Sequence, residues 1–149
     1  MKRVSQGLKI IILPLVVVLL LAQLIRIDKS NPPVRSDLAS GSAKPVLQRA
    51  CYNCHSNETT WPWYSSVAPA SWLVGRDVRE ARSRLNFSEW EAYDSGTRSH
   101  KLRGIAEEVQ GGDMPPWYYS FVHRDSRLSA SERSQILAWV TETIRPETK

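Results

Sequence analysis

The segment CYNCH, residues 51–55, holds both cysteines of the chain and one of its three histidines. Two cysteines three residues apart, followed directly by a histidine, form the pattern of a covalent haem attachment site. On a helix, Cys51, Cys54 and His55 would project from one face. Two thiols on that face can bond the vinyl groups along one edge of a porphyrin, while the imidazole coordinates its iron.

Other chemistry is open to the same five residues. A structural zinc site needs about four ligands, and the remaining histidines, His100 and His123, lie far apart in the sequence. We expect both at the surface or beside a ligand rather than on a metal. A thioredoxin-like CxxC pair would require a βαβ context, which the sequence lacks. A disulfide between Cys51 and Cys54 stays open, because exported domains permit disulfides.

A second candidate ligand lies in GGDMPPWYY, residues 111–119. Met114 is the only methionine after Met1, and it stands between a Gly-Gly pair and a Pro-Pro pair. Prolines restrict the backbone and remove amide donors, which suits a loop that presents a thioether to iron from the side opposite His55. The alternative is a methionine that fills a gap in the core. With CYNCH in the same chain, the interpretation as a ligand is favoured.

An apolar N-terminal segment precedes these residues. Its central run is IIILPLVVVLLLAQLI, Ile10–Ile25, and it follows Lys2, Arg3 and Lys9. As a helix that rises about 1.5 Å per residue, this run with its flanking residues can cross a hydrocarbon core of about 30 Å. No convincing small-x-small cleavage site follows, which favours an uncleaved transmembrane anchor over residues 1–27 rather than a removed signal peptide. The basic flank stays in the cytoplasm, so the rest of the chain faces outward.

The charge distribution bears on the partners of the chain. The net charge is +5, but residues 1–27 hold four basic and no acidic side chains, which leaves 16 basic against 15 acidic side chains in residues 28–149. A nearly neutral body has no continuous basic stripe for phosphate binding. Nucleic acid is therefore not an expected partner, whereas the membrane is one through the anchor.

The sequence predicts one folded domain behind a tether. Residues 28–41 contain proline, glycine and serine and are predicted to be a linker. The domain is expected over residues 42–146, and a chain of 149 residues with 42% hydrophobic content has room for one domain of ordinary size.

Apolar residues recur at helical spacing through this domain. The last of these runs follows Ser129 and Glu132, which are spaced as a capping box. Gly111 and Gly112 end the run before it, as glycines often do. No stretch alternates with period two for long enough to indicate a sheet. The predicted fold class is all-α, with about four or five helices.

The aromatic and basic side chains have ordinary and functional interpretations. Trp61 and Trp63 follow CYNCH and could wall a haem pocket or fill the core. The arginines of Arg76–Arg84 are expected on a solvated helix face. Three tryptophans on predicted helices are expected in the core: Trp72, Trp90 and Trp139.

Four segments in order, CYNCHSNETTWPWYSSVAP, LNFSEW, MPPWYYSFVH and LSASERSQILAW, resemble the haem-binding domain family of bacterial membrane-anchored c-type cytochromes. The resemblance runs from about Ser42 to about Arg145. It implies a small cytochrome c-like helical domain around one covalently attached haem, with an N-terminal transmembrane helix before it. The residues that match the family pattern imply four roles: Cys51 and Cys54 as haem attachment points, His55 as proximal ligand, and Met114 as distal ligand.

The predicted cofactor is one haem c with its iron. The predicted function is electron transfer on the periplasmic side of a bacterial inner membrane, because His55 and Met114 would fill both axial positions. A haem sensor or a peroxidase-like protein would need an open distal site and is the second hypothesis. The third is a haem-free tethered interaction domain with a CxxC disulfide. The sequence names no redox partner, and it favours an electron carrier or haem-binding protein over an enzyme because it contains no catalytic triad or phosphate loop.

Overall fold

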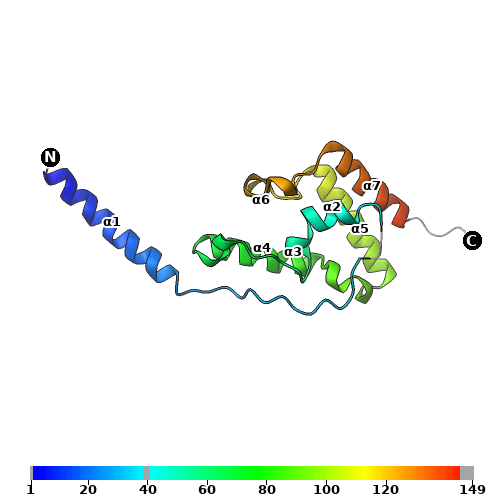
Figure 1. Ribbon diagram of the computed structural model, residues 1–149, viewed down its shortest axis with the longest axis horizontal. Coiled ribbons are helices and arrows are strands. Elements are labelled where there is room, and N and C mark those ends of the chain that lie inside the picture. Colours follow the sequence, from blue (N-terminus) through cyan, green and yellow to red (C-terminus); the bar gives the residue numbers. More distant parts are fainter. Residues whose placement is uncertain (1, 39–40, 145–149) are drawn as a thin grey trace, which may run out of the picture. The chain divides into compact units, whose positions relative to one another are not determined.

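The computed structural model describes residues 2–38 and 41–144 (Figure 1). Within these residues every regular element is helical, with seven α-helices and three short 3₁₀-helices and no strand. The prediction of an all-α fold is confirmed. The expected domain end at residue 146 and the linker positions 39 and 40 lie outside the described residues.

The chain divides into two compact units. The smaller unit comprises residues 1–30 and 61–77, and the larger unit comprises residues 31–60 and 78–149. Helix α4 (Ala70–Arg84) passes from the smaller unit into the larger one.

In the smaller unit, the segment that follows α1 (Lys2–Ala22) is fixed to the segment around Ala68. The Gln23 side chain accepts a hydrogen bond from the Ala68 amide at 2.9 Å and donates one to the Ala68 carbonyl at 3.2 Å. The Trp72 indole donates to the Ile25 carbonyl at 3.2 Å. A short 3₁₀-helix, η1 (Trp63–Ser66), completes this unit.

Helix α1 lies within residues 1–27, the segment predicted to be a membrane anchor. Its apolar side chains from Ile10 to Leu21 are exposed. In the part of the chain that the structure describes, no helix combines the length and apolar character needed to cross a membrane. The anchor over residues 1–27 therefore stays a prediction.

Trp72 is the exception among the tryptophans predicted for the core. Its exposed fraction is 37%, whereas Trp90 and Trp139 are buried as predicted. The half of α4 that lies in the smaller unit buries Ser71 and Gly75 instead. A Cβ atom at Gly75 would lie 2.9 Å from Cδ1 of Ile27. Ile27 therefore packs on the face of α4 that carries the small residues Ser71 and Gly75. Because α4 packs through that face, the Trp72 side chain stays exposed to solvent.

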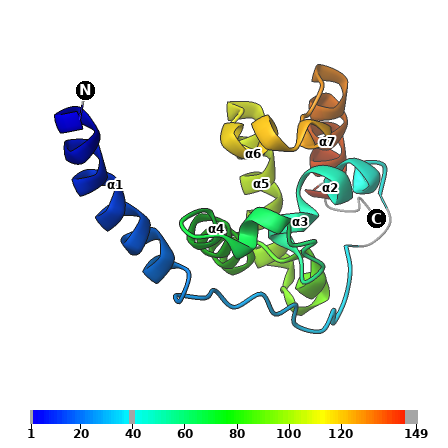
Figure 2. The same cartoon turned by 60° about the vertical axis from the view of Figure 1, so that its left-hand side comes forward.

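In the larger unit, α5 (Ser95–Gly111) packs along α7 (Ala130–Ile144) (Figure 2). Helix α2 (Lys44–Ala50) contacts α7 and completes the core. The buried residues of these three helices are apolar and recur at helical spacing. They are Val46, Leu47, Ala50, Leu102, Ile105, Val109, Ile136, Trp139 and Val140.

The ends of these helices follow the predicted signals. The Ser129 amide donates to the Glu132 carboxylate at 2.8 Å, and the Glu132 amide donates to the Ser129 hydroxyl at 3.2 Å, which is a capping box. Helix α5 ends at Gly111, and Gly112 follows with φ of 82°. This left-handed conformation favours glycine. Both predictions are confirmed.

The end of the predicted linker packs on the larger unit. The amides of Arg35 and Ser36 both donate to the Ser88 carbonyl at 3.1 Å. Asp37 accepts a hydrogen bond from Tyr52 at 2.6 Å. Leu38 is buried in the core with 3% exposure. The segment expected as a linker over residues 28–41 is therefore ordered by the fold along this part of its length.

Candidate functional site

CYNCH forms a tight helical turn at a break between two helices. Helix α2 ends at Ala50, Cys51 has φ of −121° and ψ of −36°, and α3 (Tyr52–His55) begins directly after it. The Cys51 carbonyl accepts hydrogen bonds from the amides of Cys54 at 3.1 Å and His55 at 2.9 Å. The chain therefore bends at Cys51, but the three predicted haem-binding residues of CYNCH share one turn.

This turn is anchored in the core through Tyr52. Its ring stacks on Phe87 with centroids 4.7 Å apart and an interplanar angle of 12°. Both side chains are buried. Tyr52, the first of the two residues between the cysteines, thus holds the turn on the helical core, because moving the turn would expose a stacked aromatic pair.

The two cysteines are half-buried and are not joined in a disulfide. Cys51 packs against the core. Burial, with a smaller contribution from the neighbouring Cys54, raises the pKa of the Cys51 thiol to about 12. Cys51 is therefore a protonated thiol at neutral pH rather than a reactive thiolate.

His55 is oriented by a backbone carbonyl. Its Nδ1 lies 3.1 Å from the carbonyl oxygen of Leu85. A carbonyl can only accept, so Nδ1 carries the proton, and in the neutral ring Nε2 then carries the lone pair. Burial lowers the pKa of His55, against hydrogen bonds to Leu85 and Ala81 that act in the other direction. The imidazole is thus neutral near pH 7 and has the tautomer that a metal ligand needs.

Arg82 holds the loop that follows CYNCH. Its guanidinium donates to the Ser56 carbonyl at 2.8 Å and to the Thr59 hydroxyl at 2.9 Å. A further hydrogen bond of 2.7 Å reaches the Asn31 side chain. The prediction of a solvated face over Arg76–Arg84 is wrong for this residue. The spacing of the arginines in this run gave no signal that one of them would be half-buried.

The loop that carries Met114 starts at the C-terminus of α5. The amides of Gly112, Asp113 and Met114 all donate to the Glu108 carbonyl, at 3.1, 3.1 and 3.3 Å. Met114 is half-buried. After the two prolines, the chain enters α6 (Trp117–Val122). The loop is therefore continuous with the end of one core helix and with the start of a short surface helix.

A hydrogen bond joins α6 to CYNCH. The Asn53 side-chain amide donates to the Tyr119 hydroxyl at 3.0 Å, across a separation of 66 residues. The structure thereby brings the segment after Met114 next to the haem attachment motif. This hydrogen bond is made by Tyr119, five residues after Met114, and not by Met114 itself.

The surface of α6 fits a large apolar cofactor. None of its six residues is buried. Trp117, Phe121 and Val122 are 80%, 70% and 59% exposed. Apolar side chains exposed in this way on a short helix indicate a binding surface, and a porphyrin is an apolar plate that would cover part of such a surface. Together with the Cys51, Cys54 and His55 turn, these residues fit a haem.

Trp61 and Trp63 belong to the smaller unit. Trp63 is exposed, and the indole Nε1 of Trp61 is buried without a hydrogen-bond partner.

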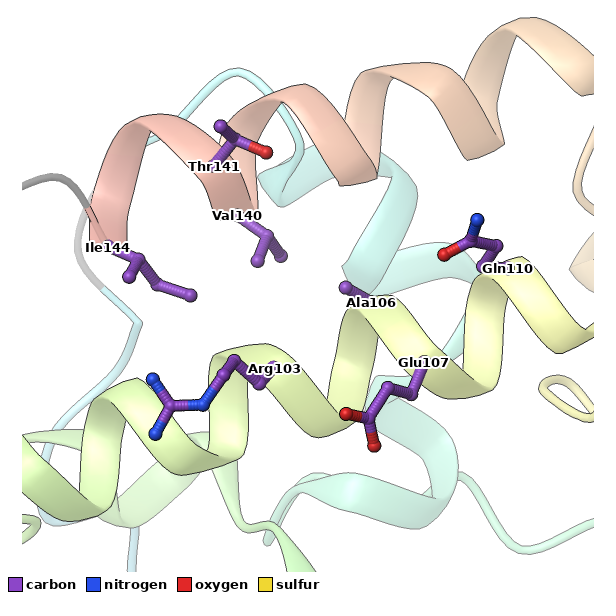
Figure 3. Close-up of a pocket in the computed structure, with 7 residues that line it drawn as sticks. All are labelled: Arg103, Ala106, Glu107, Gln110, Val140, Thr141 and Ile144. Atoms are coloured by element: carbon purple, nitrogen blue, oxygen red, sulfur yellow. The ribbon is translucent and has the colours of Figure 1, made fainter.

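A shallow groove elsewhere in the larger unit has a different character (Figure 3). Side chains of α5 and α7 line it: Arg103, Ala106, Glu107, Gln110, Val140, Thr141 and Ile144. Its base is apolar and its rim is polar, but it contains no residue of CYNCH and no Met114. In the described part of the chain, no group of three or more His, Cys, Asp and Glu side chains is arranged to hold a metal ion.

A turn with two cysteines and an oriented histidine, beside an exposed aromatic helix, is the site of a cytochrome c-like haem-binding protein. The chain belongs to the haem-binding domain family, whose sequence model matches residues 17–142. The chain is also 26% identical over 100 residues to the cytochrome c peroxidase Ccp of Escherichia coli strain K12. That match covers 65% of this chain and 22% of the relative. No solved structure matches the chain.

Proposed function

We propose that the chain is a monohaem c-type cytochrome that transfers electrons. Cys51 and Cys54 would hold the porphyrin through thioether bonds, and His55 and Met114 would ligate its iron. The bound haem supplies one-electron redox chemistry. The observation that carries the proposal is the single turn that joins two thiols to a neutral imidazole, whose Nδ1 is occupied by the Leu85 carbonyl.

The protein's own residues would tune the iron from two sides. The hydrogen bond from His55 to Leu85 fixes the orientation of the ring and raises the basicity of Nε2. A methionine thioether is a soft, neutral ligand that favours ferrous over ferric iron, so ligation by Met114 would raise the reduction potential. If His55 and Met114 both hold the iron, little room would remain for a substrate, which suits electron transfer better than substrate turnover.

A peroxidase-like function is the second candidate, and the likeness to Ccp favours it. The match covers only 22% of that protein, so its activity is carried here only as a hypothesis. A peroxidase would need an iron position that peroxide can reach. Rapid binding of cyanide and carbon monoxide by the wild-type protein, with turnover of peroxide, would favour this candidate over the electron carrier.

We also propose that residues 1–27 anchor the protein to the bacterial inner membrane, with the haem domain in the periplasm. The basic flank and the exposed apolar side chains from Ile10 to Leu21 support this location. The native protein should sediment with membranes and resist extraction by carbonate. Recovery in the soluble periplasmic fraction with a trimmed N-terminus would contradict the anchor.

The central test is covalent haem. The full-length chain, expressed with a c-type maturation system, should retain haem staining on a denaturing gel. Its intact mass should exceed that of the polypeptide by one haem. The double variant Cys51→Ala/Cys54→Ala should lose this added mass. A wild-type chain recovered without haem and with a Cys51–Cys54 disulfide, despite active maturation, would instead support the tethered interaction domain.

A further inference from the structure

Asn53, between the two cysteines of CYNCH, links three segments of the larger unit. Its side-chain oxygen accepts a hydrogen bond from the Thr60 amide at 3.0 Å. Its backbone carbonyl accepts one from the Thr59 hydroxyl at 2.7 Å. Its side-chain nitrogen donates to the Tyr119 hydroxyl at 3.0 Å. The first two bonds fix the loop after the motif, whereas the third reaches α6.

The Met114 loop has one anchor on each side. On its N-terminal side, the amides of Gly112, Asp113 and Met114 converge on the Glu108 carbonyl at the end of α5. On its C-terminal side, Pro115 and Pro116 have no amide proton and cannot form such anchors. The next side chain with a described hydrogen bond to the attachment motif is Tyr119.

Helix α6 lies at the surface of the larger unit. It buries none of its residues. Tyr119 also stacks on His123, with ring centroids 4.4 Å apart, and Arg127 donates to the Ser120 carbonyl at 2.9 Å. These contacts connect α6 to the segment that follows it, η3 (Arg124–Ser126) and Arg127. The contact with Asn53 connects it to the motif.

We propose that Asn53 and Tyr119 are positioning residues for Met114, which rests on the proposed haem ligation. Their hydrogen bond holds the Met114 loop against the segment that carries Cys51, Cys54 and His55. It thereby sets how readily the Met114 thioether leaves the iron and admits another ligand. Neither Asn53 nor Tyr119 contacts the iron in this proposal.

The test uses the full-length, haem-loaded protein and the variant Tyr119→Phe. This change removes one hydroxyl and keeps the ring that stacks on His123. The net contribution of one hydrogen bond corresponds to about a two- to twelvefold change in an equilibrium constant. The affinity of the ferric protein for cyanide should therefore rise about two- to twelvefold, and the weak far-red band of methionine-ligated ferric haem should be partly lost. Haem content per chain, measured as pyridine haemochrome, should equal that of the wild type.

Two further variants separate positioning from general packing. Asn53→Asp keeps an acceptor for the Thr60 amide and lets the Tyr119 hydroxyl donate to the carboxylate, so the band and the cyanide affinity should return toward wild type. Asn53→Ala should behave as Tyr119→Phe does. The control Ser120→Ala removes a hydroxyl from the next residue of the same helix, whose contact with the Ser126 hydroxyl is 3.4 Å long, and should leave both readouts unchanged.

The outcomes distinguish this proposal from the proposed ligation of haem by Met114, on which it rests. A wild type that lacks covalent haem, or has haem without the far-red band, overturns the Met114 assignment and this inference together. If Tyr119→Phe keeps the far-red band of the wild type and binds cyanide with the same affinity as the wild type, the positioning role alone is overturned. If Tyr119→Phe does not mature, the comparison of Asn53→Asp with Asn53→Ala decides, and equal cyanide affinities in these two overturn the proposal.

Discussion

The His55 side and the Met114 side of the site are built differently. The turn with His55 is fixed by the stacked pair Tyr52 and Phe87 and by the Leu85 carbonyl. The loop with Met114 is fixed by backbone hydrogen bonds at one end and leads into α6, which buries no residue. The protein core therefore preforms the part of the proposed site that carries His55, the proximal half, whereas we expect the part that carries Met114, the distal half, to depend on the cofactor and on a few polar contacts.

The largest expected effects come from replacing the proposed ligands, Met114 and His55. Met114→Ala should remove the far-red band, lower the reduction potential and open the iron to cyanide, while covalent haem is retained because Cys51 and Cys54 are unchanged. His55→Ala should reduce the yield of haem-loaded protein. Redox titration and absorption spectra measure both. A Met114→Ala protein with the wild-type spectrum would contradict the assignment, and His100→Ala serves as the control that should keep the band.

Phe87→Ala tests whether the proximal half is preformed. In the haem-free double variant Cys51→Ala/Cys54→Ala, this change should lower the free energy of unfolding by about 3–5 kcal/mol, because Phe87 is fully buried. Phe121→Ala, on exposed α6, should change it by less than about 0.5 kcal/mol. Urea unfolding followed by circular dichroism measures both. A haem-free protein without helical signal would show that the proximal half also depends on haem.

Arg82→Met tests a polar support of the proximal half. The substitution keeps much of the side-chain volume and removes the hydrogen bonds to Ser56, Thr59 and Asn31. The free energy of unfolding should fall by about 1–3 kcal/mol. The matched control is Arg79→Met on the exposed face of the same helix. Equal denaturation midpoints for the two variants would mean that the loop after CYNCH needs no such support.

Ser129→Ala should have the smallest effect, because the capping box lies outside both halves of the site. Loss of the cap should cost about 1 kcal/mol of unfolding free energy and leave the haem spectrum unchanged. Hydrogen bonds from the Ser129 amide and hydroxyl lower the pKa of Glu132 below its usual 4.5. This contribution is present above pH 4.5 and is lost as the pH falls through the lower folded value. Thermal unfolding of Ser129→Ala and wild type should therefore differ less in acid.

Local rules allowed part of the fold to be predicted. The single turn of CYNCH, the capping box at Ser129 and the left-handed Gly112 depend on residues within a few positions of one another. Helical periodicity identified the core faces of α5 and α7 in the same way. These features need no knowledge of which distant segments meet.

The contacts that hold the site together were not predictable by such rules. Asn53 and Tyr119 lie 66 residues apart, and neither has a spacing that indicates a pair. Arg82 is one of several arginines on a helix, and only the tertiary fold selects it to bind Ser56. The size and apolar character of Trp72 predict a place in the core. In the structure, Ile27 packs closely on Gly75, so a different face of α4 is buried.

Gln23 and Ala68, joined by two hydrogen bonds, close a loop of backbone in which CYNCH lies between the two ends. A shortened chain that starts at residue 31 would leave the amide and carbonyl of Ala68 without these partners. It would also remove the Ile27 side chain, which packs closely on Gly75. A truncation intended to replace the apolar N-terminal helix should therefore cut before Gln23, so that the stretch from residue 23 to residue 30 stays with the haem-binding part of the protein.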